Sequence, residues 1–385
     1  MSYMRRLLVL TLLATAACLG SIDGESTPIG PSTPDAGTPT TPDAGGGGGG
    51  GEEGIAPPRE VPGARPAQDG DNAVTLGPTP VVFRVDAEAR QHIAFVLSFS
   101  GPSGVVLSVD RWDGVRPVEI GLTNSNAGLR FLSVLDRERR RTYWVRAVAT
   151  TSGPATLKVT RTAFVDGDHC DADCARLIQM PLPNDPTVDG YDIDGGTFFR
   201  YWFGRRDLVM MVRHAARERA LAGDTPVFPY DFSQWDGMTP GVDVGSPRHA
   251  SHQRGKDVDI SLYGEDGIAP WRSYCTTHIT SEGRECIAGT RRNFDGRTNA
   301  RMFAAHLVSD RVTMSFLDRE LIPALRTGAV AAADAGEIDR DLLPLYSDGK
   351  HVQHWPNHDN HIHVRVSEEA YGDTRILVDA PFEAP

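Results

Sequence analysis

The sequence lacks the motifs that mark several large functional classes. It has no long basic run and no basic patch with interleaved aromatic residues, and its formal net charge is −12. Binding dominated by nucleic-acid phosphates therefore has no support, and nucleic acid is not an expected partner. The sequence also has no HExxH motif of the helix-borne zinc proteases and no GxSxG motif of the serine hydrolases. Neither enzyme class is the right template.

The N-terminal apolar run is too short to span a bilayer. It extends from Leu7 to Ala14, follows Arg5 and Arg6, and precedes three small residues and Cys18. This order resembles a bacterial lipoprotein processing site, so residues 1–18 are predicted to be a signal segment and a lipidated Cys18 the membrane anchor. Ordinary signal cleavage with an incidental Cys18 is the alternative. Both predict export, which in a Gram-negative cell means a periplasmic location. Lipidation of Cys18 would make the protein an outer-membrane lipoprotein there.

Cysteine is scarce, with five residues in the chain. Setting Cys18 aside leaves an even number in an oxidising compartment, which makes disulfides plausible. Local pairs, Cys170 with Cys174 and Cys275 with Cys286, are the simplest arrangement. Four cysteines permit three connectivities, and the sequence does not choose among them. Since no CxxC pair is present, a four-cysteine zinc site is disfavoured.

Residues 19–70 contain little that can form a core. From Ser21 to Gln68 the composition is dominated by Pro, Thr, Gly, Ala and Asp, and Gly45 to Gly51 is an unbroken glycine run. Such a segment cannot bury enough apolar surface to fold. It is predicted to be a flexible tether, which suits a folded domain anchored by a lipid.

Residues 71–166 show an all-β pattern. Short runs of β-branched and aromatic residues alternate with turn formers, and they predict a small β-sandwich. These runs are VVFRVD from Val81, IAFVLSF from Ile93, GVVLSVD from Gly104, TYWVRAVA from Thr142 and ATLKVT from Ala155. The last two, joined by TTSGP, resemble the closing strands of the bacterial pre-peptidase C-terminal domain. Such a module binds polysaccharide or protein, or serves as a passive spacer.

Residues 167–385 contain both helical and strand patterns. Apolar periodicity between Asp207 and Gly223 predicts a helix, and another is expected from Asn299 to Val308. Alternation from Val312 to Phe316 then predicts a strand. The expected fold class of this half is therefore α+β.

Two short segments hold seven of the twelve histidines: residues 249–260, HASHQRGKDVDI, and residues 351–366, HVQHWPNHDNHIHVRV. As strands, DVDI and HIHVRV alternate polar and apolar residues. The first would place Asp257 and Asp259 on one face, and the second His361 and His363. Isolated histidines are usually structural, but this concentration on two alternating strands predicts a metal site.

Two imidazoles and a carboxylate form a ligand set expected for catalytic zinc, which takes three protein ligands and leaves a fourth position for water. His252, Asp259 and His363 would supply that set for one zinc ion. The metal would polarise a scissile carbonyl and lower the pKa of water towards about 7. A neighbouring base must then accept the proton.

The two motifs match a known family. The spacing HxxxxxxD, from His252 to Asp259, and the HxH of residues 361–363 resemble the LAS metallopeptidases. The fuller patterns, HxSHxxGxDxD and HxxHxHVR, are similar to those of the penicillin-insensitive murein endopeptidases. The matching residues are His249, Ser251, His252, Gly255, Asp257, Asp259, His358, His361, His363, Val364 and Arg365. The resemblance spans about residues 190–366, but residues 264–293 do not align.

This resemblance implies a LAS-like domain with an antiparallel sheet and flanking helices. Zinc would be bound by His252, Asp259 and His363, and His361 would be the general base. His249 and His358 would line the site, where they bind substrate, stabilise the oxyanion or orient the base. Asp257 orients His252 or a neighbouring backbone group, or is a hydrogen-bonded structural carboxylate.

The implied activity is that of a zinc metalloprotease, a hydrolase that cuts the D-alanyl to diaminopimelyl cross-links between peptidoglycan stem peptides. Two alternatives remain. One is another LAS activity, either a D,D-carboxypeptidase or a secreted protease, and the unaligned stretch leaves the bond specificity open. The other is a non-catalytic lipoprotein that holds zinc and binds the wall. The HxH form at His361 favours the endopeptidase, because the carboxypeptidase relatives more often use a glutamate base.

Overall fold

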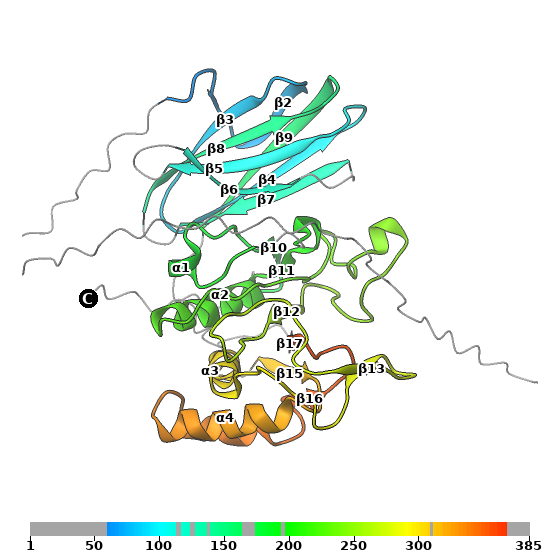
Figure 1. Ribbon diagram of the computed structural model, residues 1–385. Helices are drawn as coiled ribbons and strands as arrows, with labels where there is room; N and C mark the ends of the chain where they lie inside the picture. The colour runs from blue at the N-terminus through cyan, green and yellow to red at the C-terminus, as the bar shows by residue number, and fades with distance from the viewer. Residues whose placement is uncertain are drawn as a thin grey trace, which may run out of the picture. The chain divides into compact units, whose positions relative to one another are not determined.

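A computed structural model (Figure 1) describes residues 60–112, 117–123, 128–136, 139–163, 174–193, 197–308 and 311–367. All of these belong to one unit, Ala56–Pro385. The predicted signal segment, most of the predicted tether, Cys18 and Cys170 lie outside the described residues. Among the residues described, no helix has the length and apolar character needed to cross a membrane.

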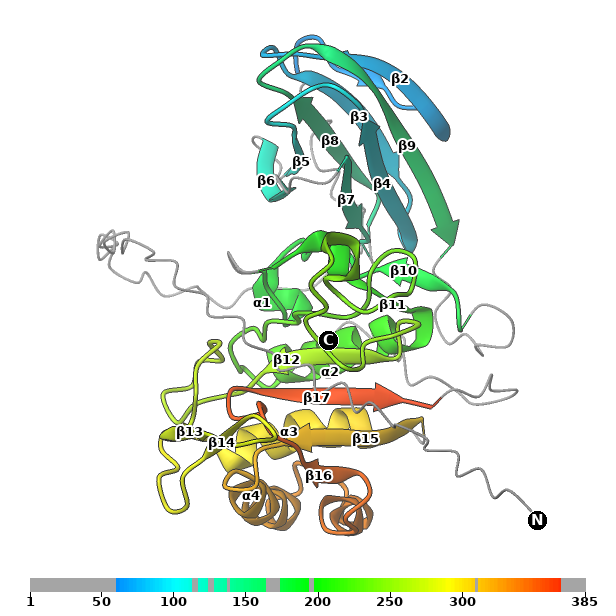
Figure 2. The same cartoon turned by 90° about the vertical axis from the view of Figure 1, so that its right-hand side faces the viewer.

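The first part of this unit consists of two β-sheets in two layers (Figure 2). A five-stranded sheet has the order β1-β3-β8-β5-β6, and a four-stranded sheet has the order β2-β9-β4-β7. The strands are β1 (Arg65–Pro66), β2 (Gly70–Leu76), β3 (Val81–Ala87), β4 (Gln91–Phe99), β5 (Val106–Trp112), β6 (Pro117–Thr123), β7 (Leu129–Val134), β8 (Arg141–Val148) and β9 (Gly153–Ala163). Each of the five sequence runs forms most of one strand, as predicted, and only Gly104, Val105 and Ala149 lie just outside.

Alternation along the strands explains the burial. In β3, Phe83 and Val85 are buried while Asp86 is exposed, and in β4 Phe95 and Leu97 are fully buried. A strand places successive side chains on opposite faces, so one apolar face of each sheet covers the core. The domain boundary near residue 166 stays a prediction.

The second part contains a four-stranded sheet with the order β12-β17-β15-β16. Its strands are β12 (Asp257–Ser261), β15 (Val312–Leu317), β16 (Val352–His354) and β17 (His361–Val366). Strand β17 pairs antiparallel with β12 and β15, and β15 pairs parallel with β16. The strands predicted from DVDI, HIHVRV and the alternation at Val312 are therefore confirmed.

Helices and short elements surround this sheet. The helices are α1 (Pro186–Asp189), α2 (Arg206–Leu221), α3 (Gly296–Leu307) and α4 (Ile322–Asp334), with 3-10 turns η1 (Phe199–Tyr201), η2 (Val242–Val244) and η3 (Arg340–Tyr346). The helix expected at Asn299 starts three residues earlier, because Asp295 caps it: its carboxylate accepts from the backbone N–H groups of Arg297 and Thr298. Two further short strand pairs are present: β10 (Leu177–Gln179) with β11 (Phe203–Arg205), and β13 (Thr277–Ile279) with β14 (Arg284–Cys286). The fold is therefore mixed α+β and mostly sheet.

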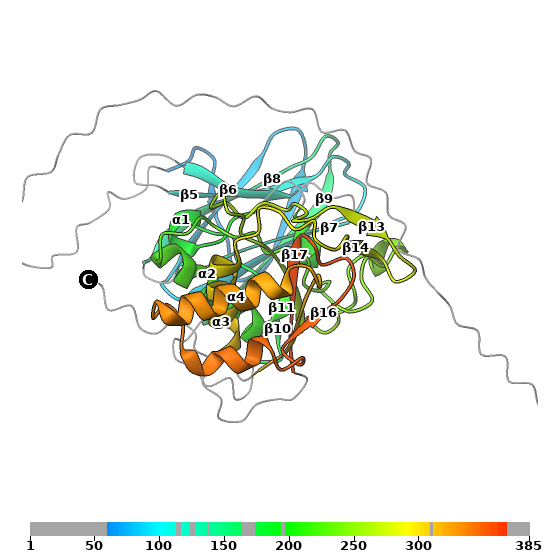
Figure 3. The same ribbon diagram turned by 60° about the horizontal axis from the view of Figure 1, so that its bottom comes forward.

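Helices α3 and α4 lie side by side (Figure 3) and approach each other at two glycines. A Cβ atom on Gly296 would lie 2.2 Å from the carbonyl oxygen of Ala324, and one on Gly328 would lie 2.1 Å from the carbonyl carbon of Gly296. Only glycine permits this approach. The α+β prediction is confirmed at this level, whereas the specific LAS-like arrangement stays a prediction.

The cysteine prediction is confirmed for one local pair. Cys275 and Cys286 form a disulfide across the β13–β14 hairpin. Cys174 is disulfide-bonded as well, and the pairing of Cys170 lies outside the described residues.

Candidate metal centre

The centre forms where two strands pair in a register that aligns their polar residues. Asp259 on β12 lies opposite His363 on β17, and Ser261 lies opposite His361. Because side chains on the same face of a sheet recur every second residue, the two polar sets meet on one face. The alternate residues Val258 and Ile260 are buried in the core.

A tight turn brings His252 to the same place. His252 adopts a left-handed backbone conformation with φ of 62°, and Gly255 has φ of 66°. A Cβ atom on Gly255 would lie 2.4 Å from Leu177 Cδ2 and 2.5 Å from the backbone nitrogen of Arg205. The glycine of the motif is therefore required by backbone geometry and by close packing. Left-handed conformations of residues other than glycine are uncommon and cluster at functional sites.

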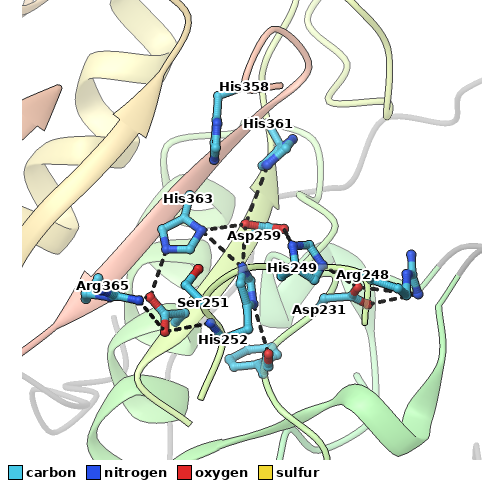
Figure 4. Close-up of polar contacts among 12 residues, drawn as sticks. Asp231, Arg248, His249, Ser251, His252, Asp259, His358, His361, His363 and Arg365 are labelled. Carbon is cyan, nitrogen blue, oxygen red and sulfur yellow. Dashed lines mark hydrogen bonds and ion pairs between the residues drawn. The ribbon is translucent and has the colours of Figure 1, made fainter. Parts of the chain in front are cut away.

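The three predicted metal ligands converge on one point (Figure 4). His252 Nε2 lies 3.1 Å from His363 Nδ1, and Asp259 Oδ1 lies 3.3 Å from the first nitrogen and 3.2 Å from the second. A tetrahedral zinc ion with bonds of about 2.0–2.1 Å sets neighbouring ligand atoms about 3.3–3.4 Å apart. The spacing of the three atoms fits such an ion.

The donor atoms themselves fit a cation. Asp259 Oδ1 is buried and has no hydrogen-bond partner among the described residues, although two imidazole nitrogens lie beside it. A buried carboxylate oxygen without a partner is costly. A bound cation would remove that cost.

Two wider groupings share the same carboxylate. Each grouping has three residues whose ligand atoms lie within 4.8 Å of one another. The first is His249, His252 and Asp259, and the second is Asp259, His358 and His361. Within these groups, His249 Nδ1 is 3.9 Å from Asp259 Oδ2 and His361 Nε2 is 3.5 Å from Asp259 Oδ1. The chain therefore has histidine and aspartate groups that can hold a metal ion. The shorter mutual distances favour His252, Asp259 and His363 as the ligands.

Hydrogen bonds orient both candidate histidine ligands. His252 Nδ1 donates to the carbonyl oxygen of Phe232 at 2.9 Å, which leaves its Nε2 lone pair free. His363 Nε2 donates to Asp257 Oδ1 at 2.8 Å, so its Nδ1 is the atom that faces His252 Nε2 and Asp259 Oδ1. Partners of this kind fix the tautomer and ring orientation of a metal-binding imidazole.

Asp257 has a more specific role than either sequence alternative. Its carboxylate accepts from the backbone N–H of His252 at 3.0 Å and from Arg365 Nε at 2.6 Å, in addition to His363. It is thus a buried hub that ties the His252 turn to β17. The sequence predicted that Asp257 orients His252 or a neighbouring backbone group, or is a hydrogen-bonded structural carboxylate. The bond to the His252 backbone agrees with the first prediction, but the bonds to His363 and Arg365 were missed. Their alternation on one strand opposite Asp257 was the signal that could have revealed them.

The carboxylates and imidazoles shift each other's pKa values. Burial raises the pKa of the Asp259 carboxyl, but the adjacent imidazoles, His252 first, outweigh burial and hold that pKa well below its usual value. Burial lowers the pKa of His363, yet the carboxylates of Asp257 and Asp259 outweigh burial and raise it. In the chain alone these groups form a compensated buried cluster.

Three further predicted residues surround the cluster. His361 Nδ1 donates to Asn360 Oδ1 at 2.7 Å, which directs Nε2 towards Asp259. His358 Nδ1 donates to the carbonyl oxygen of Pro356 at 2.7 Å, and its ring centroid lies 4.7 Å from that of His361. Burial lowers the pKa of His361 well below its usual value and lowers that of His358 to about 4. Both imidazoles are therefore neutral near pH 7.

His249 completes the set. Its Nε2 lies 2.8 Å from Asp231 Oδ2, and its ring centroid lies 4.1 Å from that of His252. Arg248 also contacts Asp231, at 3.4 Å. The structure thus brings together all six residues predicted from the two motifs.

Several contributors to the site were missed from the sequence. They are Phe232, through its carbonyl group, Asp231, Asn360 and Trp271. The Trp271 ring stacks on His361 with centroids 4.7 Å apart and an interplanar angle of 12°. None belongs to a motif, and Asp231, Phe232 and Trp271 reach the site through long-range contacts, so no local pattern could have identified these three.

Comparison with known proteins gives no family assignment. No family model and no curated protein matches the chain. Among solved structures, the chain is similar to the periplasmic g-type lysozyme inhibitor PliG of Aeromonas hydrophila at 16% identity over 26% of this chain and 96% of that chain, with a TM-score of 0.20. It is also similar to the pre-peptidase C-terminal domain of a Bacillus anthracis collagenase at 10% identity over 26% of this chain and all of that one, with a TM-score of 0.22. At these TM-scores neither likeness carries an argument about function.

Proposed function

We propose that this protein is a zinc-dependent endopeptidase that hydrolyses D-alanyl to diaminopimelyl cross-links of peptidoglycan. The observation that carries the proposal is the convergence of His252 Nε2, Asp259 Oδ1 and His363 Nδ1 at 3.1 to 3.3 Å, on a buried oxygen without a hydrogen-bond partner among the described residues. Three more imidazoles surround that point. Structural histidines rarely gather in this way, since each buried imidazole needs its own partner.

Zinc is the metal we propose because two neutral imidazoles and one carboxylate form a ligand set typical of its catalytic sites. When bound, the ion would lower the pKa of water and polarise the scissile carbonyl group. The ligand nitrogens must be unprotonated, so His363 has to lose its proton before the metal is held.

His361 is the proposed general base. Its neutral Nε2 lies 3.5 Å from Asp259 Oδ1, and Asn360 holds the opposite nitrogen. Nε2 accepts a proton from the attacking water and then returns it to the amine that leaves as the peptide bond breaks. One water molecule is consumed, and one carboxyl group and one amine are formed.

His358 and His249 are proposed to line the site, where they bind the substrate or orient the base. The ring of His358 lies beside those of His361 and His363, with centroids 4.7 and 5.7 Å away. His249 is held by Asp231, so its ring is positioned before substrate arrives. Because the single N–H of neutral His358 is donated to Pro356, its Nε2 remains as an acceptor for an N–H group of the substrate.

The choice of peptidoglycan rests on sequence features. The motifs HxSHxxGxDxD and HxxHxHVR resemble those of murein endopeptidases, and the predicted lipoprotein signal and tether would place the site within reach of the wall. Burial of His358 and His361 further supports catalysis over simple metal storage, because storage needs no neutral bases beside the ligands.

Digestion of purified cross-linked peptidoglycan by the full chain tests the proposal, with mass spectrometry of the released muropeptides. We expect muropeptide dimers to become monomers, and this conversion to stop on chelation and in His361→Gln. His351→Gln is the matched control, because His351 bonds to Asp348 outside the site and should leave conversion intact. Loss of terminal D-alanine from persistent dimers would indicate a carboxypeptidase. Stoichiometric zinc without any cleavage would indicate a binding protein.

A further inference from the structure

A tryptophan outside both motifs touches the proposed base. Trp271 lies in the stretch 264–293, which has no counterpart in the motif resemblance, yet its indole stacks nearly parallel to the His361 ring, 4.7 Å away at 12°. About 40% of Trp271 is exposed, whereas His361 is 8% exposed. The indole therefore covers a buried imidazole from the solvent side.

Trp271 is itself firmly held. The Tyr230 ring packs against it with centroids 4.1 Å apart. The next residue, Arg272, makes two hydrogen bonds of 2.7 Å to Asp266, and its guanidinium lies over the ring of Tyr274. A bidentate pair of this kind fixes geometry as well as charge. The chain next to Trp271 is therefore fixed by Arg272, and the indole itself is restrained by the Tyr230 ring.

The same segment is tied to the turn that carries His358 and His361. Arg284 and Asn357 exchange hydrogen bonds of 2.8 and 2.7 Å, and Arg284 Nε donates to Asp359 Oδ1 at 2.8 Å. The Tyr274 backbone N–H donates to the Asp359 carbonyl oxygen at 3.0 Å. The Cys275–Cys286 disulfide closes the hairpin between these anchors. These contacts hold the segment that carries Trp271 against the turn that carries His361.

We infer that Trp271 is a positioning residue for His361, an inference that rests on the proposed function. Asn360 fixes only one nitrogen of the imidazole, and a ring held by one hydrogen bond can still tilt about that bond. The flat face of the indole prevents the tilt and keeps Nε2 directed towards Asp259. A general base must stay within hydrogen-bond reach of the proton it accepts, and small displacements cost large factors in rate.

Kinetics of the full chain on cross-linked muropeptide dimers test this role. Trp271→Leu is expected to lower kcat by about 10- to 100-fold while KM and zinc stoichiometry stay nearly unchanged. Trp271→Phe should recover most of the activity, because a ring still stacks. Trp355→Leu is the control, since the Trp355 side chain is exposed and lies against Phe316 at a tilted angle. This variant should keep its kcat. A Trp271→Leu enzyme with normal kcat, or with only a raised KM, would overturn the inference.

A second measurement separates this inference from the proposed function. In the zinc-loaded chain with ¹³C-labelled histidine, the His361 ring protons should be shifted upfield by the indole, with the assignment made from His361→Gln. They should move downfield in Trp271→Leu and less in Trp271→Phe. Unmoved resonances would show that the rings do not stack, whatever the activity. An inactive wild-type chain with the expected shifts would instead refute the proposed peptidase function, and the positioning role with it.

Discussion

Replacement of Asp257 by asparagine tests whether the buried hub sets the metal affinity. Asp257 is fully buried and accepts hydrogen bonds from His363 Nε2, from Arg365 and from the His252 backbone. The asparagine amide keeps one acceptor oxygen but presents an NH₂ group to donors on the other side. Either His363 Nε2 or the backbone N–H of His252 must then lose its hydrogen-bond acceptor.

The magnitude follows from these contacts. Loss of a hydrogen-bonded partner of a metal ligand costs about 10- to 100-fold in metal affinity, which corresponds to about 1.4 to 2.7 kcal/mol. The free energy of unfolding of the metal-free protein should also fall by about 1–3 kcal/mol, because a buried donor that faces the amide NH₂ group is left unsatisfied. Asp259 remains in place, so zinc binding is weakened and not abolished.

The zinc affinity of wild type and of Asp257→Asn is measured by competition with a chromogenic zinc chelator at pH 7.5. Asp86→Asn is the matched control, since Asp86 is an exposed residue of β3 that pairs with Arg84 far from both motifs in sequence. It should leave the affinity unchanged. An Asp257→Asn affinity within twofold of wild type, in a protein shown by circular dichroism to be folded, would refute the assignment of His363 as a ligand oriented by Asp257.

Three further outcomes are expected. His361→Gln should lower kcat by about 10²- to 10⁴-fold with zinc binding retained, measured by single-turnover cleavage beside metal analysis; parallel loss of zinc would contradict a role as base. Zinc affinity should fall as pH drops through the raised pKa of His363, because the proton on that imidazole competes with the metal; calorimetric titrations between pH 5 and 8 that show no change would exclude His363 as a ligand. Gly255→Ala should destabilise the protein by about 1–3 kcal/mol, since its φ is 66° and the new Cβ would lie 2.5 Å from the Arg205 backbone nitrogen; an unchanged urea midpoint would show that the turn is not strained.

The low folded-state pKa of Asp259 also sets the sign of the acid response of the apo-protein. A carboxyl group with a depressed pKa contributes stability above its unfolded value of about 3.9, and that stability is lost as pH falls through the folded value. Acid therefore removes the cluster's contribution below about pH 4. The raised pKa of His363 lies above this range, so zinc affinity should begin to fall at a higher pH than the one at which acid destabilises the apo-protein.

Local patterns in the sequence determined much of this protein. Alternation of polar and apolar residues located β12 and β17, because period-two burial is a local property of extended backbone. The runs of β-branched and aromatic residues likewise located β3, β4, β5, β8 and β9. Helical periodicity located α2 and α3, although the start of α3 was missed since its cap, Asp295, lies upstream of the apolar residues. Motif spacing identified all six residues that converge at the centre.

Tertiary structure decided how those residues meet. The register that sets Asp259 opposite His363 and the turn that returns His252 depend on pairing across more than 100 residues of chain. The partners that orient the ligands and the base, such as the Phe232 carbonyl group and the Trp271 ring, carry no motif of their own. A sequence determines which side chains share a strand face, because that is local geometry. Only packing between distant segments determines which atoms then lie 3 Å apart.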